Sequence, residues 1–147
     1  MKRLHLHVRV KDLKQSLGFY ATLFGTDPVV TKPDYAKWQL DDPAVNFAIS
    51  TTESEAGLDH VGIQTETQDE LTEIAQRLQV AGEKTFNQKA AACCYVMSDK
   101  SWVEDPSGVR WETFFTHNSI TVYGNDTATS QEEADKLHKK TVPVSCC

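Results

Sequence analysis

Two adjacent cysteines, Cys93 and Cys94, lie in a short apolar segment and have the most distinctive chemistry in the sequence. Neighbouring Cα atoms are about 3.8 Å apart, below the range of about 4.4–6.8 Å that a disulfide usually spans, so free thiols are expected. Free cysteines are often no more than small buried hydrophobic residues. Two neighbouring thiolates, however, also suit a soft acceptor such as trivalent arsenic.

The backbone around this pair must be irregular if both sulfurs are to bind one atom. The segment is typical of a strand, and adjacent side chains of a regular strand point to opposite faces. Both sulfurs therefore reach one atom only if the strand is bulged or loop-like there, and we expect such an irregularity. A second pair, Cys146 and Cys147, forms the last two residues of the sequence. It is either incidental or a first acceptor that passes a metalloid to Cys93 and Cys94.

Three further residues have the chemistry of metal ligands. His5 and His60 each lie on an alternating apolar segment, on the side opposite its Leu and Val residues, and Glu112 lies in a later apolar segment. Two histidines and one carboxylate bind non-haem Fe(II) and leave coordination positions open. Other divalent metals accept the same ligands, so these residues alone do not choose the metal. We expect the three side chains to converge on one ion.

Simpler roles exist for the same residues. A single histidine on a strand is more often a surface or hydrogen-bonded residue than a ligand. A buried Glu112 would be costly unless paired, and Arg110 is a candidate partner that needs no metal. His7 shares the strand face of His5 and can replace or support it.

The elements that must position these residues form two similar halves. Alternating hydrophobicity predicts strands at 3–10 and 58–65. A helix follows each strand, one between Asp12 and Gly25 and the other at 68–80. Shorter strands are expected at 29–31, 36–40 and 46–50, and at about 84–87, 91–97, 101–104 and 109–115. An internal duplication about 55 residues apart is the simplest description.

Composition limits the classes of function. The 147 residues include 15 basic and 21 acidic side chains, a net charge of −6, which argues against nucleic acid or an anionic membrane as a partner. No apolar run is long enough to span a membrane, and no signal peptide is evident, so we expect a cytoplasmic protein. We expect one domain over 1–117, with modules at about 1–52 and 57–117, and a flexible polar tail over 118–147. A monomer and a homodimer are both compatible with the sequence.

Three motifs resemble the vicinal oxygen chelate superfamily over residues 3–116. They are His5-Leu-His-Val-Arg-Val-Lys-Asp-Leu followed by Ser16 and Phe19-Tyr20, then His60-Val-Gly-Ile, and Asp105-Pro-Ser-Gly-Val-Arg-Trp-Glu112. The resemblance implies an α+β fold in which two tandem βαβββ modules form a cup that binds one divalent metal. The family spacing to Asp12 favours His5 over His7. The segment 46–50 offers no fourth ligand, which disfavours a glyoxalase.

Together with Cys93 and Cys94, the set His5, His60 and Glu112 is similar to that of the Fe(II)-dependent C–As lyases and related cadmium-induced proteins. The resemblance implies that the three residues bind Fe(II) and are catalytic, while the thiols bind the substrate. That substrate would be a trivalent organoarsenical, cleaved with dioxygen to arsenite. Two alternatives stay open: a non-catalytic cadmium- or arsenic-binding protein, and another enzyme of the superfamily such as an extradiol-type dioxygenase.

Overall fold

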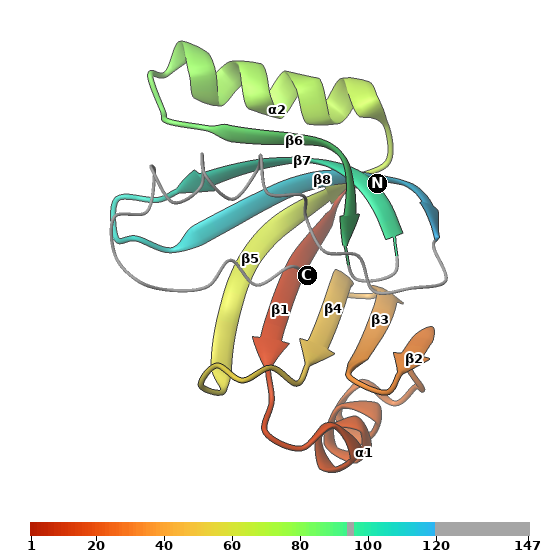
Figure 1. Ribbon diagram of the computed structural model, residues 1–147. Coiled ribbons are helices and arrows are strands. Elements are labelled where there is room, and N and C mark those ends of the chain that lie inside the picture. The colour runs from red at the N-terminus through yellow and green to blue at the C-terminus, as the bar shows by residue number, and fades with distance from the viewer. Residues whose placement is uncertain (94–95, 120–147) are drawn as a thin grey trace.

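The computed structural model describes residues 1–93 and 96–119, and the predictions for Cys94, Cys146, Cys147 and the tail from residue 120 lie outside these ranges. Each half of the chain contributes one strand, one helix and three further strands (Figure 1). The first half contains β1 (Arg3–Arg9), α1 (Leu13–Phe24), β2 (Val30–Lys32), β3 (Tyr35–Asp41) and β4 (Ala44–Ser50). The second contains β5 (Gly57–Thr65), α2 (Gln68–Val80), β6 (Phe86–Cys93), β7 (Val96–Glu104) and β8 (Arg110–Ser119). This is the predicted pair of βαβββ modules.

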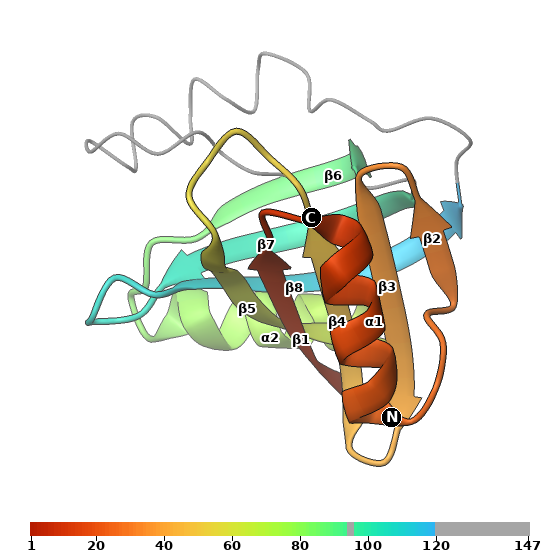
Figure 2. The ribbon, with the colours of Figure 1, turned by 90° about the horizontal axis from the view of Figure 1, so that it is seen from below.

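The eight strands of the described ranges form one sheet in the order β2-β3-β4-β1-β5-β8-β7-β6. The two modules meet where β1 pairs antiparallel with β5, and each of these strands pairs in parallel with the last strand of its own module. The sheet curves strongly, so that the two helices lie on its outer side and the inner faces of both modules turn toward each other (Figures 1 and 2). Strands β1, β5 and β8 therefore line the middle of the cup.

Helix α1 begins and ends where the sequence predicts. The Asp12 carboxylate accepts the N–H of Gln15 at 2.8 Å, and Gly25 takes the left-handed conformation with φ 68° that ends many helices. Its apolar stripe packs on β3 and β4, where Trp38 and Phe47 are buried. This helix covers the outer face of the first module and leaves the inner face to polar side chains.

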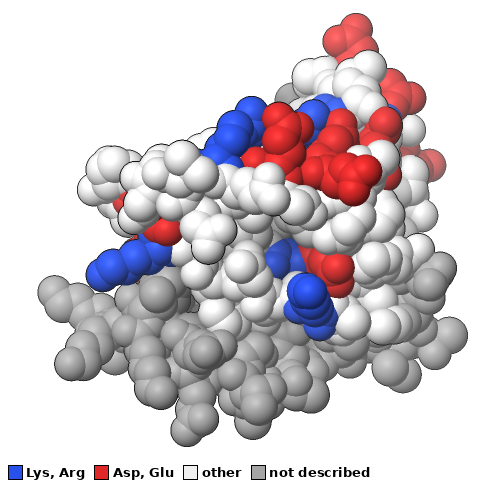
Figure 3. Space-filling model, turned by 90° about the horizontal axis from the view of Figure 1, so that it is seen from above, with Lys and Arg blue, Asp and Glu red and all other residues white. Residues whose placement is uncertain are grey.

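Helix α2 covers the outer face of the second module and packs on β5, β7 and β8. Thr67 caps it by accepting the N–H of Glu70, and Leu71 and Ile74 are its buried residues. Seen from this side, acidic groups gather over part of the surface and no extended basic patch is visible (Figure 3). Among the described residues, no helix is long and apolar enough to cross a membrane.

The strands of the second module differ from the prediction in number and length. The sequence predicts four strands after α2, and the described residues form three. The strand predicted at 91–97 is wrong because it crosses the connection between β6 and β7, and β7 continues through Ser98 and Lys100 into the strand predicted at 101–104. These polar residues resemble a break in the sequence, but they are buried on the inner face of the sheet, where polar groups collect. Strand β8 also continues to Ser119, beyond the expected strand end at 115.

Candidate metal centre

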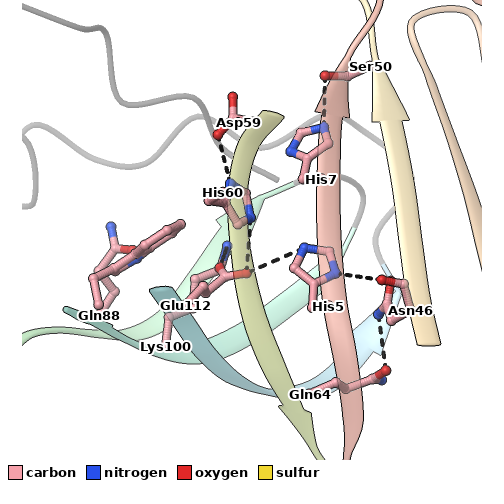
Figure 4. Close-up of polar contacts among 11 residues, drawn as sticks. His5, His7, Asn46, Ser50, Asp59, His60, Gln64, Gln88, Lys100 and Glu112 are labelled. Atoms are coloured by element: carbon pink, nitrogen blue, oxygen red, sulfur yellow. Dashed lines mark hydrogen bonds and ion pairs between the residues drawn. The ribbon is translucent and has the colours of Figure 1, made fainter. Parts of the chain in front are cut away.

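The structure brings together the three predicted ligands, which come from three adjacent strands. His5 lies on β1, His60 on β5 and Glu112 on β8, and their exposed fractions are 2%, 1% and 0%. Glu112 Oε2 is 3.5 Å from His60 Nε2 and 3.8 Å from His5 Nε2 (Figure 4). One ligand atom from each residue lies within 4.8 Å of the others.

These distances fit a single metal ion. Imidazole nitrogens and carboxylate oxygens bind such ions at about 2.0–2.2 Å, so neighbouring ligand atoms around one ion lie roughly 3 Å apart. The observed separations are slightly wider than this, and small side-chain rotations close the difference. His5 Nε2 is buried and has no hydrogen bond with any described residue, which leaves its lone pair available to a metal.

Hydrogen bonds on the far side of each imidazole orient both rings. His5 Nδ1 is 3.0 Å from the Asn46 carbonyl oxygen, which only accepts, so the proton lies on Nδ1 and the lone pair on Nε2. His60 Nδ1 is 2.7 Å from Asp59 Oδ1, which fixes the same tautomer. Such outer partners are typical of metal-binding histidines. The Asp59 carboxylate is itself buried and lies 3.5 Å from the Arg9 guanidinium.

His7 takes a different place. It is fully buried, its Nε2 is 2.9 Å from the Ser50 hydroxyl, and its ring lies edge-on to that of His60 at 5.2 Å. Two sets of described residues are close enough to hold one metal ion. The first is His5, His60 and Glu112, and the second is His7, Asp59 and His60. The geometry therefore favours His5 over His7 as the partner of Glu112.

Glu112 has a cationic partner that differs from the expected one. Lys100 Nζ on β7 is 2.9 Å from Glu112 Oε1, and both side chains are buried. The guanidinium of Arg110 instead lies 4.7 Å from the centre of the Trp102 ring. Arg110 precedes Glu112 by two residues on the same strand, but Lys100 comes from the neighbouring strand, so only the pairing of β7 with β8 reveals it.

A small polar hollow opens beside two of the ligands, His5 and Glu112. His5, Lys100 and Glu112 line it together with Asn46 and Ser98. Asn46 Oδ1 and Ser98 Oγ are buried and have no hydrogen-bond partner among the described residues. Because an unsatisfied buried oxygen is costly, these atoms are placed to interact with water or a polar ligand.

Two features position β8: the turn that precedes it and its close pairing with β5. The turn that precedes it is held by Asp105, whose Oδ1 accepts the N–H of Val109 at 3.0 Å and that of Ser107 at 2.8 Å. The bond from Val109, followed by that from Ser107, lowers the pKa of the Asp105 carboxyl. Within the sheet, Gly62 on β5 pairs with Glu112, and a Cβ at Gly62 would overlap the Glu112 carbonyl oxygen.

The thiol pair is described only in part. Strand β6 ends at Cys93, whose backbone pairs with Val96 of β7, and Cys94 lies in the two-residue connection outside the described ranges. The expected irregularity at Cys93 and Cys94 therefore stays a prediction. An irregularity of β6 does occur slightly earlier, between Gln88 and Ala91.

Three residues that contact the centre are not predicted from the sequence: Lys100, Asp59 and Asn46. A signal for Lys100 exists, since Ser98, Lys100 and Trp102 alternate along one strand and the last of them is a typical core residue. Asp59 directly precedes His60, but adjacency on a strand normally separates two side chains. Asn46 contributes through its backbone carbonyl, which no sequence pattern indicates.

Several named proteins are similar in sequence to this chain over most of its length. A trivalent organoarsenical cleaving enzyme of Bacillus sp. (strain MD1) is 37% identical over 123 residues, which cover 82% of this chain and 76% of the relative. A protein of the same name from Thermomonospora curvata is 37% identical over 116 residues, covering 78% and 77%. The cadmium-induced protein CadI of Mycobacterium tuberculosis (strain ATCC 25618 / H37Rv) is 30% identical over 126 residues, covering 85% and 83%.

Solved structures share the fold. Homoprotocatechuate 2,3-dioxygenase from Brevibacterium fuscum gives a TM-score of 0.61 at 20% identity over 81% of this chain, and the enzyme from Arthrobacter globiformis gives 0.60 at 18% over 80%. This chain spans 38% and 36% of those two chains, and at such identities the likeness is one of fold alone. The family described as Glyoxalase/Bleomycin resistance protein/Dioxygenase superfamily matches residues 2–113. With this match and the named relatives together, the chain belongs to that superfamily.

Proposed function

We propose that this protein is a non-haem Fe(II)-dependent dioxygenase that cleaves the carbon–arsenic bond of trivalent organoarsenicals such as methylarsenite and trivalent aromatic arsenicals. The observation that carries the proposal is the buried group of His5, His60 and Glu112, in which both imidazole Nε2 atoms face one carboxylate oxygen. The names of the relatives from Bacillus and Thermomonospora support the substrate class.

The three residues are suited to hold Fe(II) with open coordination positions. Two neutral imidazoles and one carboxylate are the ligand set of many non-haem iron oxygenases. When bound, the iron would supply the redox chemistry that dioxygen activation requires. Asn46 and Asp59 would keep the two imidazoles in the ligating tautomer, and the small polar hollow beside Glu112 would accept a water-sized ligand.

The thiols would select and position the substrate. Trivalent arsenic prefers thiolate to imidazole or carboxylate, so Cys93 and Cys94 would bind it as a dithiolate. Holding the arsenic in place would keep its carbon substituent close to the reacting oxygen, which lowers the entropic part of the barrier. Since thiolate is the binding form, organoarsenical affinity would fall at low pH.

The overall reaction balances without a further reductant. Methylarsenite and dioxygen together contain the same atoms as arsenite and formaldehyde. Arsenic stays trivalent, the methyl carbon is oxidised and dioxygen is reduced. Hydrogen moves from carbon to the arsenic-bound oxygen as the carbon–arsenic bond is replaced by arsenic–oxygen and carbon–oxygen bonds.

The test compares arsenite release by four proteins. Wild type, Glu112→Ala, Cys93→Ser and a control variant, Glu73→Ala, are loaded with Fe(II) without air, mixed with methylarsenite and then exposed to air. Glu73 is an exposed residue of α2 that lies 3.7 Å from Arg77, so its removal changes the charge but not the centre. Release by wild type and the control, with loss in the other two variants, is expected.

Other outcomes separate the alternatives. A soft-metal-binding protein would bind arsenic or cadmium through Cys93 without turnover, and that binding would survive Glu112→Ala. The similarity to the cadmium-induced protein CadI is the observation that favours this alternative. Another dioxygenase of the superfamily would release no arsenite and would keep activity on its own substrate after Cys93→Ser. No arsenite from wild type would contradict the proposal.

A further inference from the structure

Strand β6 contains a bulge three residues before Cys93. Gln88 pairs with Lys100 and Ala91 with Ser98, so two residues of β6, Lys89 and Ala90, lie opposite the single residue Asp99 of β7. Gln88 and Ala91 are both buried, while Lys89 and Ala90 are exposed. The bulge therefore keeps Gln88 and Ala91 on the same face although they are three residues apart.

A second bulge lies beside the first, on the other neighbour of β7. Met97 pairs with Asn118 and Ser98 with Thr116, which leaves His117 as the extra residue of β8. Both neighbours of β7, β6 on one side and β8 on the other, are thus bulged close to Asp99. The two bulges shift the register of the strand ends beyond them, where Cys93 and Ser119 each pair with Val96.

Asp99 contacts the extra residue of both bulges. Its Oδ1 accepts the backbone N–H of Ala90 at 2.7 Å and lies 3.2 Å from His117 Nε2. Ala90 has φ 50°, a left-handed conformation that is strained for alanine. The bond to Asp99 satisfies the N–H of this strained residue, and it comes from the residue directly opposite the bulge.

Resting on the proposed role of the thiols, we propose that Asp99 is a positioning residue for organoarsenical binding. Its carboxylate stabilises both bulges and so sets the register in which the end of β6, as far as Cys93, pairs with β7. A shift of one residue moves every following side chain of a strand to the opposite face of the sheet. The register at Ala91 therefore fixes how the rest of β6, as far as Cys93, pairs with β7.

Asp99 takes no part in the candidate metal groups that the described residues form. The candidate metal groups contain His5, His60 and Glu112, or His7, Asp59 and His60, and Asp99 belongs to neither. Its neighbour Lys100 faces Glu112 instead. Strained residues persist where surrounding contacts fix them, and they are frequent at functional sites.

Binding measurements on four proteins test this role. Wild type, Asp99→Ala, Asp99→Asn and the double variant Asp99→Ala with Ala90→Gly are titrated with methylarsenite by calorimetry without iron, and separately with Co(II). Asp99→Ala is expected to weaken arsenical binding roughly tenfold, the cost of one strained residue, and to leave Co(II) affinity unchanged. Asp99→Asn keeps an acceptor for the Ala90 N–H, and glycine adopts φ 50° without strain, so both of these variants should recover much of the loss.

Amide hydrogen exchange at Ala90 gives a readout that does not depend on arsenic. Slow exchange is expected in wild type and Asp99→Asn, and faster exchange in Asp99→Ala. Wild-type arsenical affinity in Asp99→Ala, or an equal loss of Co(II) affinity, would overturn the inference. A Cys93→Ser variant is titrated in parallel: if it binds methylarsenite like wild type, the proposed function of the thiols fails, whereas the Ala90 exchange data still decide whether Asp99 holds the bulge.

Discussion

At the scale of single residues, the two oxygens of Glu112 have different partners. Oε2 faces the imidazoles of His5 and His60, and Oε1 pairs with the Lys100 ammonium. A carboxylate held in this way offers one oxygen to a metal, so more coordination positions stay open. Lys100 also balances the buried charge of Glu112 when no metal is bound.

The Lys100→Met variant should therefore be less stable than wild type without metal, and it should bind divalent metal more tightly. Without metal, Glu112 loses its cationic partner, and the free energy of unfolding is expected to fall by about 3–5 kcal/mol. Divalent metal should bind several-fold more tightly, because a neighbouring positive charge is gone and the second oxygen is free. Urea unfolding and Co(II) titration measure the two quantities. Arg110→Met, which removes a charge that contacts Trp102, is the control; weaker Co(II) binding by Lys100→Met would contradict the assignment.

At the scale of elements, the pairing of β5 with β8 places the carboxylate beside the histidines. Gly62 permits this pairing, because any side chain there would meet the Glu112 backbone. Gly62→Ala is expected to lower the free energy of unfolding by about 1–3 kcal/mol and to weaken metal binding. The control is Gly18→Ala in α1, where nothing lies within 4 Å of an added Cβ and alanine favours the helix. Equal stability of Gly62→Ala and wild type would refute this account of the close approach.

The turn before β8 should make stability depend on pH. Hydrogen bonds from Val109 and then Ser107 lower the pKa of Asp105 below its ordinary value, so folding favours the ionised carboxylate. Its contribution is complete above the unfolded pKa and is lost as the pH falls through the folded pKa. Asp105→Ala is therefore expected to be less stable than wild type at neutral pH, with a difference that narrows below about pH 4. Urea unfolding across this range provides the measurement, and a difference that stays constant would count against the turn.

Much of this arrangement follows from alternation in the sequence, and some of it does not. The pattern of 3–10 and 58–65 predicts which face His5 and His60 occupy, and the caps at Asp12 and Gly25 predict α1. Lys100 reaches Glu112 through the regular pairing of β7 with β8, whereas Asp99 contacts the extra residues of two bulges, Ala90 and His117. Local hydrophobicity contains no information on such bulges, and it divides β7 because the buried polar residues Ser98 and Lys100 resemble a break.

At the scale of the whole molecule, the candidate metal centre joins the two modules. His5 comes from the first module and His60 and Glu112 come from the second, across the β1–β5 pair. Glu112 pairs with the residue two positions after His60, and the equivalent position on β4, opposite His7, is Ala48, which supplies no fourth ligand. A bound ion would therefore stabilise the association of the modules as well as the site.

Removal of metal should lower the stability of the whole fold. Metal at a hundred times its dissociation constant is expected to raise the free energy of unfolding by about 2.7 kcal/mol if the unfolded chain does not bind it. Thermal unfolding with added Fe(II) or Co(II), and again after chelation, measures this difference. Glu112→Ala should show no such shift, while an equal shift in that variant would place the metal elsewhere.

The most direct test of the central claim is the stoichiometry of the reaction. Fe(II)-loaded protein is mixed with methylarsenite in a closed cell, and dioxygen uptake, arsenite and formaldehyde are measured together. The proposed chemistry predicts one dioxygen consumed for each arsenite and each formaldehyde formed, with none formed by Glu112→Ala. Arsenite release that continues without dioxygen, or from protein stripped of metal, would contradict it.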